Sequence, residues 1–158
     1  MTRYEQLVDE VESDGIEVIE FDFSCDELHG LYSDGCVAIN KNLPSDEKLV
    51  TLYEEWGHAK VSYGNILDQS KLSNRKQELA ARRWAHEKFM PIERFINLII
   101  EHRPADTWEL LEIMNVPYSY LCDLINYYQQ KYGPFKEFNN DGINGCIWFQ
   151  PIDIAVYK

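Results

Sequence analysis

The chain contains the segment Thr51-Leu-Tyr-Glu-Glu-Trp-Gly-His58, within a helical pattern that starts after Pro44. Because Glu54 and His58 are four residues apart, one face of this helix carries both side chains. Glu55 lies about 100° round the helix from Glu54 and is able to lean toward the same cleft. Zinc peptidases use two ligands one helical turn apart, with a general-base glutamate between them. The segment therefore predicts a metal-binding helix on which glutamate replaces the first histidine.

Each of these residues also has a purely structural interpretation. Glu54 and Glu55 fit a solvated acidic face, and His58 fits a position near the carboxyl end of a helix, where the helix dipole favours it. A glutamate and a histidine at this spacing occur often by chance. The segment alone leaves both interpretations open, so the decision depends on the rest of the chain.

A second segment strengthens the metal interpretation. Glu78 stands in a helix expected to run from near Asn74 to Met90-Pro91, where the proline breaks it. Ala81 and Ala85 lie on the same side of this helix as Glu78, and such small residues let two helices approach closely. The Glu78 carboxylate is therefore placed to meet the face that carries Glu54 and His58. Three protein ligands plus a water form an open catalytic site.

Two other histidines were considered as ligands. His29 precedes the predicted hairpin, where it would be able to supply an imidazole, but a polar loop position explains it more simply. His86 follows Glu78 by eight residues, which places it about 80° round the helix. We therefore expect His86 on the surface, and neither histidine is assigned to the site.

The remaining pattern predicts an α+β fold. Ile19, Phe21 and Phe23 alternate with acidic residues, as in a half-buried strand. Ser33-Asp34-Gly35 separates two short apolar runs and predicts a hairpin turn. A loop is expected around Gly64-Asn65.

The domain division follows from a change in composition after Gly133-Pro134. Residues 1–132 are expected to form one domain, with a small N-terminal β-sheet, a helical core and a C-terminal helical pair. Residues 133–158 are expected to form a C-terminal extension with short strands, because apolar residues cluster at 147–157.

The helical pair over residues 106–132 has a helix-turn-helix rhythm, yet it does not fit a DNA reader. A recognition helix carries basic or amide side chains toward bases and phosphates. Here the second helix has no basic residue before Lys131. The pair therefore predicts packing, or docking of a partner, and no direct contact with nucleic acid.

Net charge, cysteine content and the lack of long apolar segments limit the partners and the compartment of the protein. The formal net charge is −12, which repels phosphate backbones and attracts basic partners. The four cysteines, at positions 25, 36, 122 and 146, form no CxxC pair and fit a reducing compartment. The first residues lack an apolar run, and no apolar stretch approaches the length of a membrane span. We therefore expect a cytoplasmic protein without membrane contact.

Four segments together resemble the ImmA/IrrE family of bacterial and phage metallopeptidases. They are Gly30 to Asn40, Thr51 to His58, Glu78-Leu-Ala-Ala-Arg-Arg-Trp-Ala85 and Phe89-Met90-Pro91. The resemblance covers residues 30 to 130 and is of the phage or prophage type. It implies a zincin-like core and the cleavage of basic, DNA-binding repressor-type regulators that control mobile elements or stress genes.

The resemblance also implies roles for individual residues. His58 and Glu78 would be zinc ligands, Glu55 the general base, and Glu54 a ligand at the position of the first histidine. Two carboxylates neutralise the charge of the metal and weaken it as a Lewis acid, which leaves Mn²⁺ or another divalent ion as an alternative to Zn²⁺. The leading function is thus a metal-dependent endopeptidase. The alternative is a catalytically inactive zincin-like regulator that binds a repressor or toxin without cleaving it.

Overall fold

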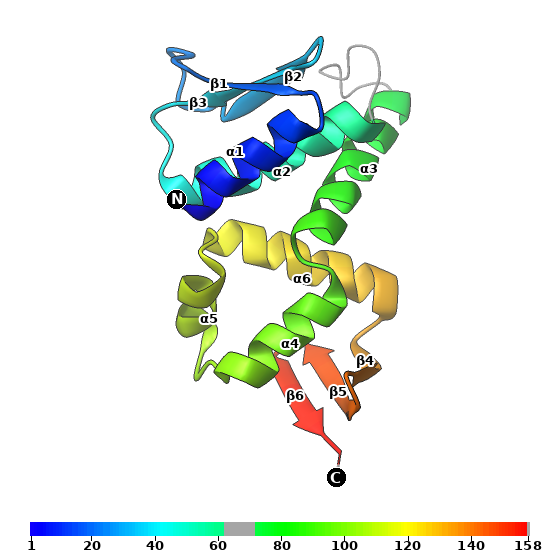
Figure 1. The fold of residues 1–158 in the computed structure, drawn as a ribbon. Coiled ribbons are helices and arrows are strands. Elements are labelled where there is room, and N and C mark those ends of the chain that lie inside the picture. The colour runs from blue at the N-terminus through cyan, green and yellow to red at the C-terminus, as the bar shows by residue number, and fades with distance from the viewer. Residues whose placement is uncertain (62–71, 158) are drawn as a thin grey trace. The chain divides into compact units, whose positions relative to one another are not determined.

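The computed structural model describes residues 1–61 and 72–157, and Figure 1 shows their fold. The loop predicted around Gly64-Asn65 lies outside these residues. Contacts divide the chain into two compact units, Met1–Phe89 and Met90–Lys158. The described residues form six helices and two three-stranded sheets, which confirms the predicted α+β fold.

The first unit consists of three helices and one sheet. Its elements are α1 Arg3–Ser13, β1 Glu17–Phe21, β2 Gly30–Ser33, β3 Cys36–Asn40, α2 Ser45–Val61 and α3 Leu72–Phe89. β3 is the central strand, parallel to β1 and antiparallel to β2. The sheet lies over α1 and α2 (Figure 1). The side chains of Val37 and Ile39, on the central strand β3, are fully buried.

The predicted hairpin is confirmed as the connection between β2 and β3. Asp34 and Gly35 have φ angles of 48° and 82°. Two successive positive φ values match the right-handed twist of the flanking strands, and the Asp-Gly pair supplies them at low cost. The hairpin places β2 against α2, which is the helix that carries Glu54, Glu55 and His58.

The alternation of buried and exposed residues predicted for β1 is not present, because Val18 is partly buried and the other four residues of the strand are exposed. Ile19 and Phe21 are 37% and 52% exposed, whereas Val18 is partly buried. Val18 pairs with buried Val37 in the parallel register and therefore shares its inner face. Because neighbouring residues on a strand face opposite sides, Ile19 and Phe21 are on the outer face.

The second unit also combines three helices with one sheet. Its elements are α4 Ile92–His102, α5 Thr107–Met114, α6 Tyr118–Tyr132, β4 Phe135–Asn140, β5 Ile143–Phe149 and β6 Ile152–Val156. The strands form an antiparallel sheet in the order β4-β5-β6. Phe95, Tyr128 and Phe149 pack together in the core of this unit. α3 ends at Phe89 and α4 starts at Ile92, as Pro91 predicts.

The compact units divide the chain at a different point from the predicted domains. α4 and α6 pack against β4, and α6 also packs against β5, so the last three helices group with the C-terminal strands. The predicted division into a domain of residues 1–132 and an extension of residues 133–158 differs from this division into compact units and stays a prediction.

Candidate metal centre

Three side chains from α2 and α3 meet at one place in the first unit. Glu54, His58 and Glu78 each offer a ligand atom, and these atoms all lie within 4.8 Å of one another. The Nε2 atom of His58 is 3.2 Å from Oε2 of Glu78. Among the described residues this is the one group of three or more His, Cys, Asp or Glu side chains arranged to hold a metal ion. The structure thus brings together the three residues that were predicted as ligands, while their role as ligands stays a prediction.

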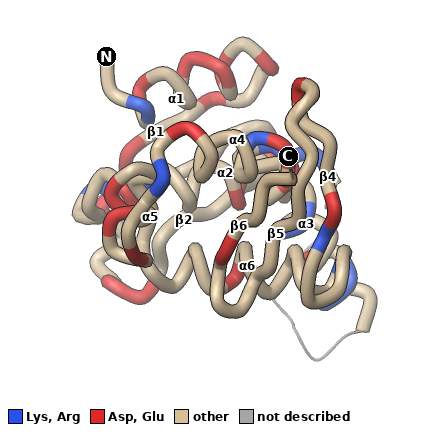
Figure 2. Tube along the Cα trace, turned by 90° about the horizontal axis from the view of Figure 1, so that it is seen from below, with Lys and Arg blue, Asp and Glu red and all other residues tan. Residues whose placement is uncertain are grey.

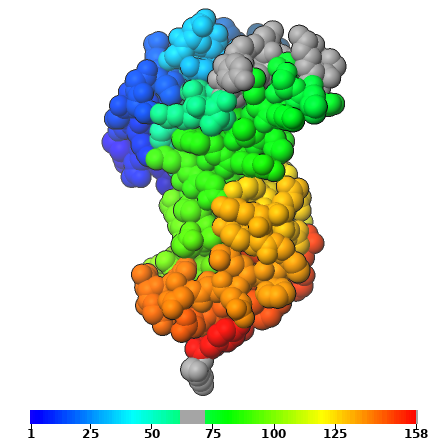
Figure 3. Space-filling model, turned by 90° about the vertical axis from the view of Figure 1, so that its right-hand side faces the viewer, coloured from blue at the N-terminus to red at the C-terminus, as the bar shows by residue number. Residues whose placement is uncertain are grey.

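Close packing of α2 on α3 brings these side chains together. Ala81 and Ala85 are 0% and 4% exposed, so the small residues of α3 do line a helix contact. Gly57 is their counterpart on α2, since a Cβ atom at this position would collide with the carbonyl oxygen of Ala81. The space-filling view shows α2 directly against α3 (Figure 3). Gly57 precedes His58, so the closest approach of the two helices is beside the candidate site.

Glu55 is held on the same helix beneath β2. A Cβ atom at Gly30 would lie 2.7 Å from Cγ2 of Thr51 and 3.0 Å from Cγ of Glu55, so the strand rests on this part of α2. Burial raises the pKa of Glu55 to about 8, and the charges of Glu54 and Glu78 add to the effect. A hydrogen bond from the backbone of Tyr32 acts in the opposite direction. A divalent cation beside these carboxylates would favour the ionised form of Glu55, which a general base requires.

The two ligand candidates on α2 have pKa shifts that burial dominates. Burial raises the pKa of Glu54; Arg82 opposes this shift and Glu78 reinforces it. Burial lowers the pKa of His58. The negative charge of Glu78 raises this pKa, and the positive charge of Arg82 lowers it further. His58 therefore favours the neutral imidazole, which is the form that binds metals.

Arg82 is a site residue that the sequence analysis missed. Its Nε atom lies 3.4 Å from Oε1 of Glu54 and 3.2 Å from Oε1 of Glu78. It therefore neutralises part of the negative charge that the two carboxylates bring together. The available signal was its position four residues after Glu78, a spacing that favours an ion pair on a helix. Such pairs are common on exposed helix faces, so the spacing did not single out Arg82.

The donor atoms fit a divalent metal ion in number, chemistry and spacing. Ligands about 2.0–2.1 Å from a tetrahedral zinc ion lie about 3.3 Å from each other. The distance of 3.2 Å between His58 Nε2 and Glu78 Oε2 agrees with this spacing. One neutral imidazole and two carboxylates would form a three-ligand set, the number that catalytic zinc sites use.

His29 and His86 are not part of the group. His29 is exposed in the loop before β2, as the simpler interpretation predicted. His86 is 8% exposed, so its predicted surface position is wrong. Ala85, His86 and Phe89 are all buried, which shows that the buried arc of α3 is wider near its carboxyl end than the seam of alanines alone suggested.

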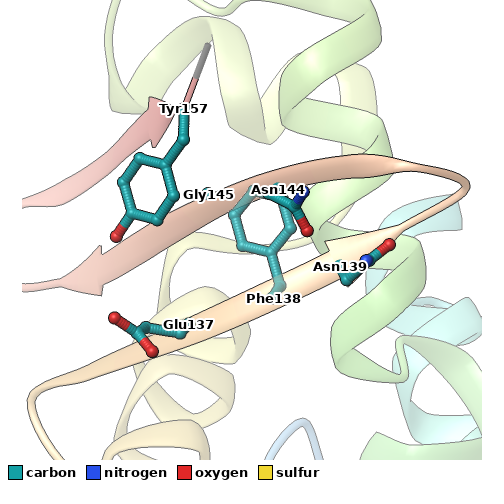
Figure 4. A pocket seen from close by; sticks show the side chains of 6 residues that line it. All are labelled: Glu137, Phe138, Asn139, Asn144, Gly145 and Tyr157. Carbon is teal, nitrogen blue, oxygen red and sulfur yellow. The ribbon is translucent and has the colours of Figure 1, made fainter.

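The second unit offers hollows but no comparable cluster of ligands. One hollow of about 420 Å³ is bordered by Glu137, Phe138, Asn139, Asn144, Gly145 and Tyr157, as Figure 4 shows. Another, of about 390 Å³, is lined by residues of α4, α5 and β6, most of them apolar. Neither lining contains a histidine or a cysteine, so the candidate catalytic chemistry stays with the first unit.

The family model for peptidase M78, described as the IrrE N-terminal-like domain, matches residues 11–125. The chain belongs to this family. The matched segment of the M78 family includes Glu54, Glu55, His58 and Glu78, and it agrees with the suspected ImmA/IrrE resemblance and with a zincin-like α+β fold. Membership supports a metallopeptidase-like function on a protein substrate and implies a divalent metal. Comparison with curated proteins and with solved structures found no match.

None of the helices in residues 1–61 and 72–157 combines the length and the apolar character that crossing a membrane requires.

Proposed function

We propose that this protein is a metal-dependent endopeptidase that cleaves a helix-turn-helix repressor-type regulator of a phage or another mobile element. The observation that carries the proposal is the convergence of Glu54, His58 and Glu78 within 4.8 Å, with Glu55 beside them. A metallopeptidase needs metal donors together with a nearby carboxylate that accepts a proton. The proposed metal is Zn²⁺, with Mn²⁺ as the alternative.

The residues of the site have distinct roles in this proposal. Glu54, His58 and Glu78 hold the ion and keep one coordination position free. A bound divalent ion supplies Lewis acidity, which polarises the scissile carbonyl and lowers the pKa of a water molecule. Glu55 accepts the proton of the attacking water and later delivers it to the leaving amine. The backbone of Tyr32 keeps the Glu55 carboxylate oriented while it is ionised.

The substrate proposal follows from charge. The chain has a net charge of −12, which favours encounter with a basic protein and disfavours nucleic acid. DNA-binding repressors are basic because they contact phosphates. All four cysteines are free, which fits action in the reducing cytoplasm, where such regulators bind DNA.

One observation favours a second candidate function. Glu54 stands where a two-histidine site has its first imidazole, so the ligand set carries one more negative charge and weakens the ion as a Lewis acid. A regulator that binds a repressor or toxin without cleaving it would retain the surface of the fold and tolerate this loss. The experiment below separates the two candidates.

The test is proteolysis of a helix-turn-helix repressor encoded beside this gene, followed by mass spectrometry of the fragments. Glu55→Gln preserves the shape of the side chain but cannot accept a proton at neutral pH, so cleavage should fall by about 10²–10⁴-fold. The matched control is Glu47→Gln in the first turn of the same helix, which should cleave like the wild type. Metal analysis of untagged protein should show one bound ion, and His58→Ala should lose it.

Two results would contradict the endopeptidase proposal. Fragmentation that persists unchanged in Glu55→Gln would remove Glu55 as the base. Repressor that binds but stays intact, with zinc and with manganese, would leave the non-catalytic regulator as the function.

A further inference from the structure

Two aromatic side chains of the helical pair α5–α6 are unusually exposed. Trp108 is 70% exposed and Tyr118 is 57% exposed. Their rings stack with centroids 6.1 Å apart and planes inclined by 28°. Tryptophan and tyrosine combine a large apolar face with a polar tip, and both are enriched in protein interfaces. This stacked pair is therefore a candidate contact surface.

Core packing does not explain the position of Trp108. The buried residues of α5 are Leu110, Leu111 and Met114, which lie on a different face of the helix. α5 begins at the Asp106 cap, whose side chain accepts a hydrogen bond from the backbone of Glu109, and it ends before α6 starts at Tyr118. Trp108 in the first turn of α5 and Tyr118 at the start of α6 thus both present their rings to solvent.

The charged residues between Pro104 and Gln130, the stretch that carries the two rings, are all acidic. Residues 104–130 contain Asp106, Glu109, Glu112 and Asp123, all of them exposed, and no Lys, Arg or His. Figure 2 marks acidic positions in red and basic positions in blue along the chain. Glu112 follows Trp108 by four residues, so it shares a helix face with the ring. An aromatic pair with carboxylates nearby, on a segment whose single cation is Lys131 at the far end of α6, is chemically matched to a planar cation.

We propose that the surface formed by Trp108, Tyr118 and Glu112 docks an arginine-containing basic segment of the protein partner. A guanidinium group stacks on an aromatic face and pairs with a carboxylate at the same time, whereas an ammonium group lacks the planar face. This inference rests on the proposed function for the identity of the partner, since the proposed substrate is a basic protein. It assigns to the second unit a recognition role that is separate from the chemistry of the first.

The direct test measures binding of a labelled nona-arginine peptide by fluorescence anisotropy, with nona-lysine of the same charge as the comparison probe. The protein is metal-free Glu55→Gln, so that cleavage does not disturb the measurement. Nona-arginine should bind more tightly than nona-lysine. Trp108→Ala and Tyr118→Ala should each weaken nona-arginine binding by about three- to thirty-fold, the range expected for one cation–π contact. Trp108→Phe should retain most of the affinity, and circular dichroism should confirm that each variant is folded.

Matched controls distinguish peptide binding at the proposed surface from a general attraction of basic peptides to an acidic protein. Phe135 is 49% exposed and stands next to Lys136, so Phe135→Ala removes a comparable ring outside the acidic surface. Glu12→Gln on α1 removes the same charge as Glu112→Gln, because both glutamates are exposed. Only the Trp108, Tyr118 and Glu112 variants should lose affinity.

Each contrary result overturns the docking proposal. Equal losses in Phe135→Ala and Trp108→Ala, or equal affinities for the two peptides, would show that net charge alone binds them. A shift from dimer to monomer in Trp108→Ala, seen by analytical ultracentrifugation, would show that a second copy of the chain covers this surface. If Trp108→Ala binds normally while Glu55-dependent cleavage proceeds, the docking proposal fails and the endopeptidase proposal stands. If docking holds and no cleavage occurs, the endopeptidase proposal fails alone.

Discussion

Polar side chains have different kinds of partner at two places in the molecule, one in each compact unit. In the second unit they are paired with backbone carbonyls: the Tyr128 hydroxyl donates to Met90, and Nδ2 of Asn140 donates to the carbonyl of Glu93 at 3.2 Å. In the first unit, Glu78 raises the cost of ionising Glu54, and Arg82 neutralises the two carboxylates only in part. Groups that are fully paired stabilise a fold, whereas like charges held together need a further cation. This difference places the candidate chemistry in the first unit.

The largest expected effect tests the close helix contact in the first unit. Gly57→Ala would gain about 1 kcal/mol on an exposed helix, since alanine is the better helix former. Here the added Cβ would collide with the backbone of Ala81, and overpacking of this kind costs about 1–3 kcal/mol, so we expect a net loss of stability. Separation of α2 from α3 should also weaken zinc binding. Urea unfolding and zinc titration measure the two effects.

The control for this variant is Ala80→Leu, which adds volume at an exposed position of α3. It should leave zinc affinity unchanged. A Gly57→Ala protein that is more stable than the wild type and binds zinc equally well would show that the close contact does not organise the site.

A narrower effect, on stability alone and not on zinc binding, is expected from the paired polar group of the second unit. Tyr128 is fully buried, and its hydroxyl donates to the carbonyl of Met90. Tyr128→Phe keeps the ring but leaves this carbonyl without its donor, which should cost about 1–3 kcal/mol in the free energy of unfolding. Chemical denaturation measures the loss, and an unchanged midpoint would contradict the contrast between the units.

The next effect concerns the cation that partly neutralises the site. Arg82→Met removes both ion pairs, so the metal-free protein should lose up to about 1 kcal/mol, a limit set by solvent screening of half-exposed charges. Stabilisation by added zinc should then become larger than in the wild type, because zinc replaces the positive charge that Arg82 supplied to the carboxylates. Thermal unfolding with and without zinc tests this. A smaller zinc-induced shift would indicate that Arg82 assists metal binding instead.

The smallest effect is a pH dependence outside the site. Hydrogen bonds from Lys60 and Trp56 hold the pKa of Asp14 below its usual value of 3.8. A lowered folded pKa contributes stability above the unfolded pKa, and this contribution disappears as the pH falls through the folded pKa. Asp14→Asn should therefore be less stable than the wild type near neutral pH, and the difference should shrink below about pH 4. A difference that is constant from pH 3 to pH 7 would contradict this assignment.

Sequence patterns predicted the parts of the site that depend on spacing along one helix. The four-residue interval between Glu54 and His58 and the seam of Ala81 and Ala85 both correspond to side chains that share a face. The hairpin was also predictable, because Asp34-Gly35 favours two positive φ angles locally.

Features that depend on contacts between distant segments were not predictable in this way. The need for glycine at position 57 follows from the backbone of Ala81, which lies opposite to it on α3. The contact of Arg82 with Glu54 follows from the packing of α2 on α3, which brings Glu54 close to Glu78. The inner face of β1 depends on its parallel register with β3, which a period of two residues does not specify. The boundary between the compact units likewise depends on which sheet the last helices pack against.

The arrangement around Glu78 has a consequence for ion selectivity. Its Oε2 atom faces His58, while its Oε1 atom is paired with Arg82 at 3.2 Å. One oxygen is thus left to coordinate an ion, so a bidentate carboxylate would require Arg82 to move. Calcium takes six to eight oxygen ligands and commonly uses bidentate carboxylates, whereas zinc accepts a few donors, imidazole among them. The carboxylate-rich site should therefore discriminate against calcium even when calcium is far more abundant than zinc.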